Sequence, residues 1–206
     1  MATATKVDYK RELTGVYRAP TFPVFVYVPD LSFVMIDGRG EPEGSAAFSE
    51  AVEALYGVSY GSKFRMKRAG FDYAVMPLEG LWWTPKGDWD YRDRGWWRWT
   101  LMIMQPDRVG VDVVADTVAT MRADNRCRSA LAKLRFERWH EGPSAQVLHI
   151  GPYATEPETI ERLHAFIDTE GYEPVGKHHE IYLGDPRRTA PQRLRTILRQ
   201  PVAPKR

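Results

Sequence analysis

The feature that most constrains the fold is an order of segments that occurs twice along the chain. Ser32 to Asp37 is a short apolar run, and Gln146 to Ile150 is another. A glycine- and proline-containing turn follows each run, and then come apolar residues at helical spacing, ended by Gly57 in the first half and by Gly171 in the second. Extended segments follow both helices. This order predicts the α+β class with an antiparallel sheet, and two similar halves would leave a groove between them.

The second helix begins at a Thr-x-x-Glu sequence, Thr155 to Glu158, which is the signature of a capping box. Between the halves, residues 111–133 have the spacing of a linking helix, with a break allowed at Asp124-Asn125. A chain of 206 residues is long enough for one sizeable domain or two small fused ones. We interpret residues 1–206 as a single domain made of two pseudo-repeats, about 20–105 and 134–186.

Six of the seven tryptophans lie between Glu79 and Trp99. They are Trp82, Trp83, Trp89, Trp96, Trp97 and Trp99. Each indole brings an N–H group that needs a partner, so a dense cluster suits a wall that holds a flat, partly polar guest. Glu79 adds a carboxylate, and aromatic faces attract positive charge, which favours planar or cationic organic molecules. The alternative is that the tryptophans belong to two paired strands and fill a core.

Alternation along the strands indicates which side chains share a face. On an uninterrupted strand Trp97 and Trp99 lie on the same face. In the last apolar strand, Glu180 and Tyr182 share one face and Ile181 lies on the other. Because Ile181 belongs on the core side, Glu180 and Tyr182 are expected to face the groove.

The formal net charge of +2 is too small to indicate nucleic-acid binding. The charge is nevertheless uneven, since residues 187–206 contain seven Lys or Arg and no acid. Leu194, Ile197 and Leu198 within this stretch have the spacing of a short amphipathic surface helix. The alternative for this stretch is a contact with a polyanion or a protein partner.

Several classes of site and location are not expected. No stretch approaches about 18 uninterrupted apolar residues, so the chain is not expected to cross a membrane. The single cysteine, Cys127, excludes an intramolecular disulfide, and with no leader sequence at the start it predicts a cytoplasmic protein. His178 and His179 would point to opposite faces of a strand, and neither a metal site nor a cofactor is predicted.

Taken together, these segments resemble the GyrI-like (gyrase-inhibitor-like) small-molecule-binding family, and its standalone members in particular. The resemblance covers nearly the whole chain. The segments that carry it are His149 to Tyr153, His179 to Pro186 with Arg187 to Pro191 after it, Leu31 to Arg39, Glu53 to Val58, Pro77 to Trp83 and Arg135 to Arg138.

The resemblance implies a duplicated strand-helix-strand-strand (SHS2-type) module that encloses a ligand cleft on a pseudo-twofold axis. In members fused to a helix-turn-helix domain, the Glu matching Glu180 meets cationic, aromatic drugs in that cleft. This chain has no extra segment long enough for such a module, so direct nucleic-acid binding is not expected. Some standalone members hydrolyse strained cyclopropane rings in DNA-alkylating natural products by means of an aromatic cage, which makes this chain a possible cyclopropanoid cyclopropyl hydrolase.

On this basis we hypothesise that Glu180 orients or deprotonates water and that Tyr182 or Tyr60 donates a hydrogen bond. The remaining candidate residues would hold an aromatic small molecule; they are Glu79, Trp82, Trp83, Trp97 and Trp99. Each carboxylate has a simpler alternative, Glu180 as a surface residue and Glu79 in a loop cap or salt bridge. Two other functions stay open: a non-catalytic sensor or buffer, and a protein-interaction module acting on a partner such as DNA gyrase. The physiological ligand and the oligomeric state stay open as well.

Overall fold

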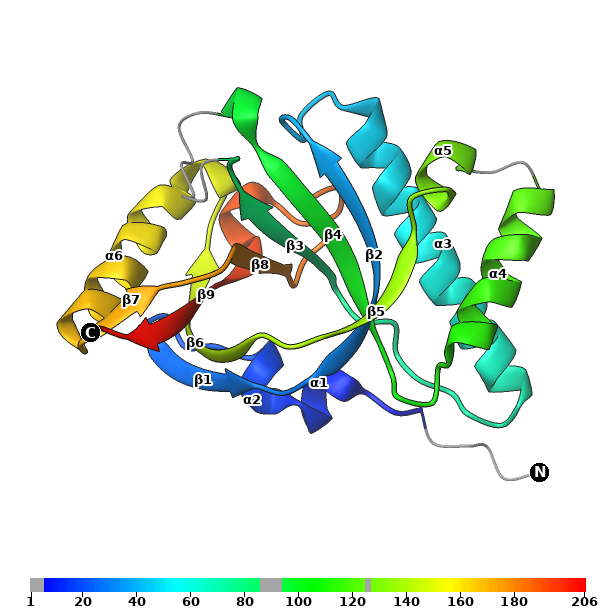
Figure 1. Ribbon diagram of the computed structural model, residues 1–206, viewed down its shortest axis with the longest axis horizontal. Helices are drawn as coiled ribbons and strands as arrows, with labels where there is room; N and C mark the ends of the chain where they lie inside the picture. Colours follow the sequence, from blue (N-terminus) through cyan, green and yellow to red (C-terminus); the bar gives the residue numbers. More distant parts are fainter. Residues whose placement is uncertain (1–5, 86–93, 125–126) are drawn as a thin grey trace.

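The computed structural model describes residues 6–85, 94–124 and 127–206. Within these ranges nine strands form one sheet in which every pairing is antiparallel (Figure 1), which confirms the α+β class. The strands are β1 Val24–Val28, β2 Leu31–Arg39, β3 Leu78–Trp83, β4 Arg98–Gln105, β5 Arg135–Trp139, β6 Gly142–Ile150, β7 Tyr172–Pro174, β8 His178–Tyr182 and β9 Arg195–Pro204. The α-helices are α1 Tyr9–Glu12, α2 Thr14–Tyr17, α3 Ala46–Arg68, α4 Val111–Ala123, α5 Arg128–Leu131 and α6 Glu156–Thr169. Short 3-10 helices span η1 Arg94–Trp96, η2 Tyr153–Thr155 and η3 Pro191–Arg193.

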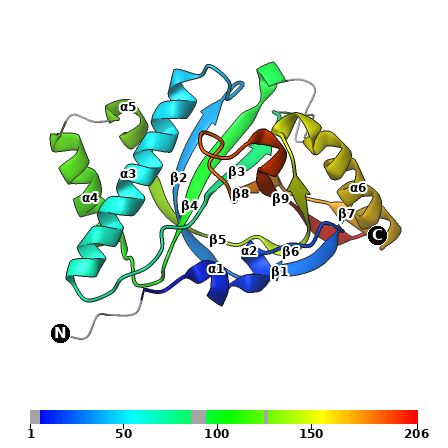
Figure 2. The ribbon, with the colours of Figure 1, turned by 180° about the vertical axis from the view of Figure 1, so that it is seen from behind.

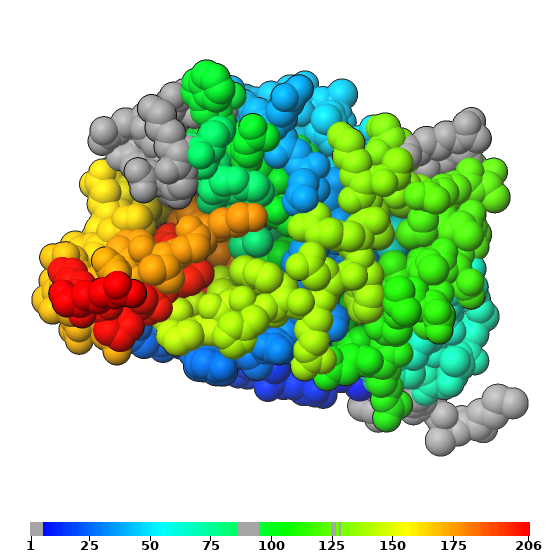
Figure 3. Space-filling view, viewed as in Figure 1, coloured from blue at the N-terminus to red at the C-terminus, as the bar shows by residue number. Residues whose placement is uncertain are grey.

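The sheet is strongly curved because its two ends are joined by short connections. Its strand order is β1-β6-β9-β8-β3-β4-β2-β5, with β7 paired to β9. Only Pro29 and Asp30 join β1 to β2, and only His140 and Glu141 join β5 to β6. Two residues span only a few ångströms, so the opposite ends of the strand order must lie close together. On the side seen in Figure 3, the segments of β5 to β6 (yellow-green) and β7 to β8 (orange) lie side by side across this curved sheet.

The element order shows the same sequence of elements twice. The first set is β2, α3, β3 and β4, and the second is β6, α6, β8 and β9 with β7 added. Figure 2 shows α3 toward one end of the sheet and α6 toward the other, with β3 and β8 between them. The last strand of the second set lies beyond residue 186, where the predicted second repeat ends. The division into two pseudo-repeats stays a prediction.

The prediction that Gly57 ends the first helix is wrong, because α3 continues to Arg68. Gly57 and Gly61 lie where α3 packs against α4. A Cβ atom on either glycine would lie 2.4 Å from a side chain of α4, Met121 for Gly57 and Thr117 for Gly61. The two glycines therefore permit a close helix-helix contact instead of terminating the helix. Gly171 does follow the end of α6, and it adopts a φ of +80°.

Over the predicted linking helix of residues 111–133 the structure has two helices. The first, α4, ends at Ala123 with Asp124 as its C-cap, next to the break allowed at Asp124-Asn125. The second, α5, spans Arg128–Leu131. Both pack on α3 and complete the helical layer at that end of the sheet (Figure 1).

The predicted amphipathic helix near the C-terminus is wrong. Residues 195–204 form β9, which pairs with β6 along one edge and with β8 along the other. Ile197 lies in the main core, and its neighbour Leu198 lies in the smaller core under α6. A strand buried on both faces does not need to alternate between apolar and polar residues, so its spacing can imitate that of a helix.

Candidate functional site

The candidate site lies on the face of the sheet that is turned toward α3 and α6. In the pairing of β3 with β8, Gly80 lies opposite Glu180 and Trp82 lies opposite His178, so these residues share that face. The ring of Phe48, from the first turn of α3, stacks on Trp82 with a centroid separation of 6.3 Å. Glu180 and Trp82 thus lie on the face that α3 and α6 cover, and not on the opposite face of the curved sheet.

Three polar side chains form a hydrogen-bonded chain across this face. The Tyr182 hydroxyl donates to Glu180 Oε2 at 2.7 Å, and Trp82 Nε1 donates to the Tyr182 oxygen at 3.1 Å. Gly80 makes room for this arrangement. A Cβ atom there would lie 2.8 Å from Trp82 Nε1 and 3.1 Å from the Tyr182 oxygen.

A second carboxyl group, which the sequence analysis missed, belongs to the site. Glu156, the first residue of α6, is 5% exposed, and its Oε1 has no hydrogen-bond partner among the described residues. Burial and the nearby Glu180 raise the pKa of Glu156 well above its usual range. The Glu156 carboxyl therefore keeps its proton to higher pH than an ordinary glutamate does.

Glu156 lies inside the segment Thr155 to Glu158, which the sequence analysis interpreted only as a capping box of Thr155 and Glu158. That prediction is wrong, because Thr155 makes no side-chain hydrogen bond to the start of α6. Its hydroxyl instead donates to the carbonyl oxygen of Pro152 at 2.9 Å. The first turn of α6 instead buries Glu156 near Glu180.

Further aromatic rings contact Tyr182 and Trp82. Tyr153, in η2, meets Tyr182 edge to face at 5.9 Å, and Trp97 meets Trp82 in the same manner at 5.5 Å. Burial, followed by the charge of Glu180, raises the pKa of Tyr182 well above 10, and burial also raises that of Tyr153 to about 12. Both phenols therefore stay neutral, and the Tyr182 hydroxyl remains a hydrogen-bond donor.

The other tryptophans and Tyr60 differ in where they lie. Trp99 is opposite Trp82 in the pairing of β3 with β4, so it shares the face of Trp82, but it is fully buried, with its ring across Gly38 and 5.2 Å from Phe48. Trp83 lies on the opposite face from Trp82, and the ammonium group of Lys177 sits 3.5 Å from its ring centroid. Tyr60 is on the exposed side of α3. Trp96 is exposed, and Trp89 lies outside the described residues.

Glu79 takes part in a buried network on the other face of the sheet. It is 1% exposed, and it accepts hydrogen bonds from the Tyr17 hydroxyl at 2.8 Å and from His179 Nε2 at 3.0 Å. His179 Nδ1 donates to Glu141 at 2.8 Å, and Arg199 Nη1 donates to Glu141 at 2.9 Å. Two carboxylates are thus matched by an imidazolium and a guanidinium, which explains how so many charges can be buried.

The pKa values in this network follow from that pairing. Burial alone would raise the pKa of Glu141, but His179 and Arg199 lower it to about 2. Burial would lower the pKa of His179, but Glu141 and Glu79 hold it above its usual value. Each ring nitrogen of His179 faces a carboxyl oxygen, which favours the doubly protonated ring. Glu79 and Glu180 do not form one site.

Over residues 21–203 the chain matches the GyrI-like small molecule binding domain. The chain belongs to the GyrI-like family. An uncharacterized conserved protein from Listeria innocua is 35% identical, with a TM-score of 0.88 and coverage of 96% of this chain and 100% of its own. A hydrolase encoded by lin2189 of the same organism is 34% identical, with a TM-score of 0.85 and coverage of 97% and 100%. A further L. innocua hydrolase is 34% identical, with a TM-score of 0.83 and coverage of 96% and 100%. Among curated proteins, no match was found.

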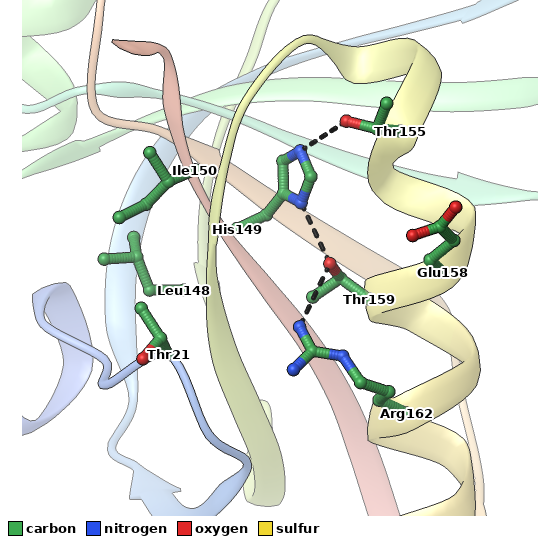
Figure 4. A pocket seen from close by; sticks show the side chains of 8 residues that line it. All are labelled: Thr21, Leu148, His149, Ile150, Thr155, Glu158, Thr159 and Arg162. Atoms are coloured by element: carbon green, nitrogen blue, oxygen red, sulfur yellow. Dashed lines mark hydrogen bonds between the residues drawn. The ribbon is translucent and has the colours of Figure 1, made fainter. Parts of the chain in front are cut away.

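This GyrI-like chain also has a hollow of about 410 Å³ beside the first turns of α6 (Figure 4). His149, Thr196 and Tyr182 are consecutive partners across β6, β9 and β8, so the hollow lies next to the Glu180 site. Its polar groups bond mainly to one another. Thr159 is 2.9 Å from His149 Nδ1, and Arg162 donates to the Thr159 hydroxyl at 3.3 Å (Figure 4).

In residues 6–85, 94–124 and 127–206, no three His, Cys, Asp or Glu side chains are placed to hold a metal ion. None of the helices that the structure describes is long and apolar enough to cross a membrane. For a GyrI-like domain the class of ligand is a small molecule.

Proposed function

We propose that this GyrI-like chain binds flat, aromatic, cationic xenobiotics over Glu180 and Glu156, between α3 and α6. The observation that carries the proposal is the pair of buried carboxyl groups, Glu180 bonded to the Tyr182 hydroxyl and Glu156 with an Oε1 that has no hydrogen-bond partner among the described residues. Burying such a group is costly unless a partner offsets the cost. A cation would supply that partner, and the rings of Trp82 and Tyr182 would stabilise it further.

We further propose that the site hydrolyses cyclopropane-bearing, DNA-alkylating compounds. Two L. innocua relatives that are 34% identical over nearly the full length of both chains are hydrolases, which supports a hydrolytic reaction. In a cyclopropane conjugated to a dienone, ring opening develops negative charge on the carbonyl oxygen. The site would therefore need a base for water and a proton donor for that oxygen.

Glu180 and Glu156 suit these two roles. Glu180 would take a proton from water while the water oxygen bonds to a cyclopropane carbon. The carbon-carbon bond would break, and its electron pair would pass through the ring to the carbonyl oxygen, where the proton of Glu156 would complete a phenol. Because the Tyr182 hydroxyl already donates to Glu180, Glu156 is the better donor. Acid or base assistance of this kind is typically worth about 10²- to 10⁴-fold in rate.

The test is incubation of the purified protein with a cyclopropane-bearing spirocyclohexadienone, with ring-opened product followed by mass spectrometry. Glu180→Gln and Glu156→Gln are the test variants. Glu158→Gln is the matched control, because Glu158 is exposed in the same turn of α6. Multiple turnovers that are lost in both test variants and kept in the control would support the hydrolase.

Two other results would change the proposal. Saturable quenching of tryptophan fluorescence without product would leave a binding protein that acts as a sensor or buffer. If neither product nor quenching appears, both parts of the proposal fail, and a protein partner becomes the function to test.

A further inference from the structure

A row of aromatic side chains runs along α3, away from the site. Tyr56, Tyr60 and Phe64 are spaced four residues apart, and we call them the aromatic stripe. Successive rings lie 6.3 and 6.4 Å apart and within 30° of parallel. Tyr60 is 47% exposed and Phe64 is 50% exposed. A continuous exposed row of stacked rings is unusual on a soluble domain, and such rows often mark a binding surface.

The inner end of the stripe adjoins the site. Tyr56 is half-buried and lies near the backbone of Leu78 and near Tyr153, whose ring meets that of Tyr182 at 5.9 Å. In the pairing of β3 with β8, Glu79 lies opposite Ile181, so Leu78 is the next residue in register with Tyr182. The stripe therefore starts beside Tyr182 and leads outward along α3, which Figure 2 shows passing obliquely in front of the sheet.

The charges beside the stripe restrict what can lie on it. The ammonium group of Lys63 is 5.1 Å from the centroid of the Phe64 ring, and it is paired with Asp72 at 2.6 Å. Lys67 is paired with the same carboxylate at 3.3 Å. A second cation would be repelled at this outer end, whereas a neutral aromatic group could stack on Phe64.

We propose that the aromatic stripe is an outer subsite continuous with the Glu180 site, and that it selects elongated ligands with a cationic or electrophilic head and a flat, neutral aromatic tail. The proposal rests on the proposed function, because the head group would lie over Glu180 and Glu156. From Tyr56 to Phe64 the helix rises about 12 Å, which is room for more than one ring of the tail.

The tail of the same ligand fits the stripe better than a second protein does. The stripe is one side chain wide, and paired charges of Lys63, Lys67 and Asp72 border its outer end. A stable protein interface needs about 800 Å² on each partner, which a single row of rings does not provide. The inner end of the stripe also meets the site, as expected of one continuous binding surface.

The experiment compares two probes with the same head. The short probe is 1-methyl-4-phenylpyridinium, and the long probe carries two more phenyl rings in line. Binding is measured by calorimetry to the wild type, to Tyr60→Ala and Phe64→Ala, and to Glu180→Gln. Phe22→Ala is the matched control, because Phe22 is a comparably exposed phenylalanine outside the stripe. Alanine favours the helix and these rings are exposed, so both stripe variants are expected to fold.

We expect the wild type to bind the long probe more tightly than the short one. Tyr60→Ala and Phe64→Ala should each lower the affinity for the long probe by about three- to tenfold, the usual value of one aromatic contact. The affinity for the short probe should not change. Glu180→Gln should lower the affinity for both probes, and Phe22→Ala should lower neither affinity.

Equal affinity of the wild type for both probes would overturn the outer subsite and leave the proposed function standing. So would a loss that is the same for both probes in the stripe variants. If neither probe binds the wild type, the proposed function fails and the outer subsite fails with it. A wild-type dimer that Phe64→Ala converts to a monomer would show that a second copy covers the stripe.

Discussion

Glu79 and Glu180 stand on adjacent strands, β3 and β8, but on opposite faces of the sheet. Glu180 is paired across the strands with Gly80, and Glu79 is paired with Ile181, so alternation sends the two carboxyl groups in opposite directions. Glu79 is enclosed by hydrogen bonds from Tyr17 and His179, whereas Glu180 shares its face with aromatic rings. Substitutions on the first face should change stability, and those on the second should change ligand binding.

Glu156→Gln should make stability less sensitive to alkaline pH. The pKa of Glu156 is higher in the folded chain than its unfolded value of about 4.3, so the folded state binds this proton more tightly. That stabilisation is complete below the unfolded pKa and is lost as pH rises through the raised folded pKa. Urea unfolding should be measured at pH 5, 7 and 9. As pH rises, the free energy of unfolding of the variant should increase relative to that of the wild type. The same difference at all three pH values would contradict the assignment.

Glu141→Ala should destabilise the fold by about 3–5 kcal/mol, because it leaves two buried cations, His179 and Arg199, without their partner. Chemical denaturation measures this loss. Glu137→Ala is the control, since its ion pair with Arg135 is exposed and should be worth less than about 1 kcal/mol.

The stability that the Glu141 network contributes should be lost both at acid pH and at alkaline pH. The pKa of Glu141 is about 2 in the folded chain and about 4.3 when unfolded, so its contribution is present above pH 4.3 and is lost as pH falls toward 2. The pKa of His179 is raised, so its contribution is complete below about pH 6.5 and is lost as pH rises through the folded value. The thermal unfolding temperature of the wild type should decrease as pH falls from about 4.3 toward 2. A Glu141→Gln variant whose unfolding temperature decreased just as steeply over this range would contradict this account.

Gly80→Ala should impair ligand binding or turnover while the protein stays folded. The added methyl group would lie 2.8 Å from Trp82 Nε1 and 3.1 Å from the Tyr182 oxygen, so both side chains must move. A misplacement near 1 Å can cost about 100-fold in rate. Quenching titrations and product formation measure the loss, and circular dichroism checks the fold. At Gly15 an added Cβ would meet nothing within 4 Å, so Gly15→Ala should behave as the wild type.

Trp82→Phe should reduce ligand-induced fluorescence quenching and weaken the affinity by about tenfold, because it removes an indole face and the hydrogen bond to Tyr182. Trp83→Phe is the matched control from the next position of the same strand. Since Trp83 lies on the other face under Lys177, its replacement should leave quenching and affinity unchanged. A larger loss in the control would place the ligand on the opposite face of the sheet.

The sequence was most informative where local rules act alone. Two helices with strands around them could be located from apolar spacing, and Gly171 was correctly placed after α6 because the chain must turn there with a positive φ. Alternation along β8 also placed Glu180 and Tyr182 on one face, and the hydrogen bond between them confirms this arrangement. A strand reverses its side chains at every residue whatever it packs against, so this prediction needed no tertiary information.

The tertiary structure decided what depends on partners distant in sequence. Gly57 resembles a helix end, but its small size is required by Met121 of α4. The segment of Ile197 and Leu198 resembles an amphipathic helix, but β6 and β8 bury both of its faces. Glu156 lies between the two residues of the predicted capping box and was given no role, because its proximity to Glu180 requires α6 to fold over β8. Spacing along a chain describes only how a segment can present its own side chains, whereas a site forms when distant segments are packed together and their charges leave water.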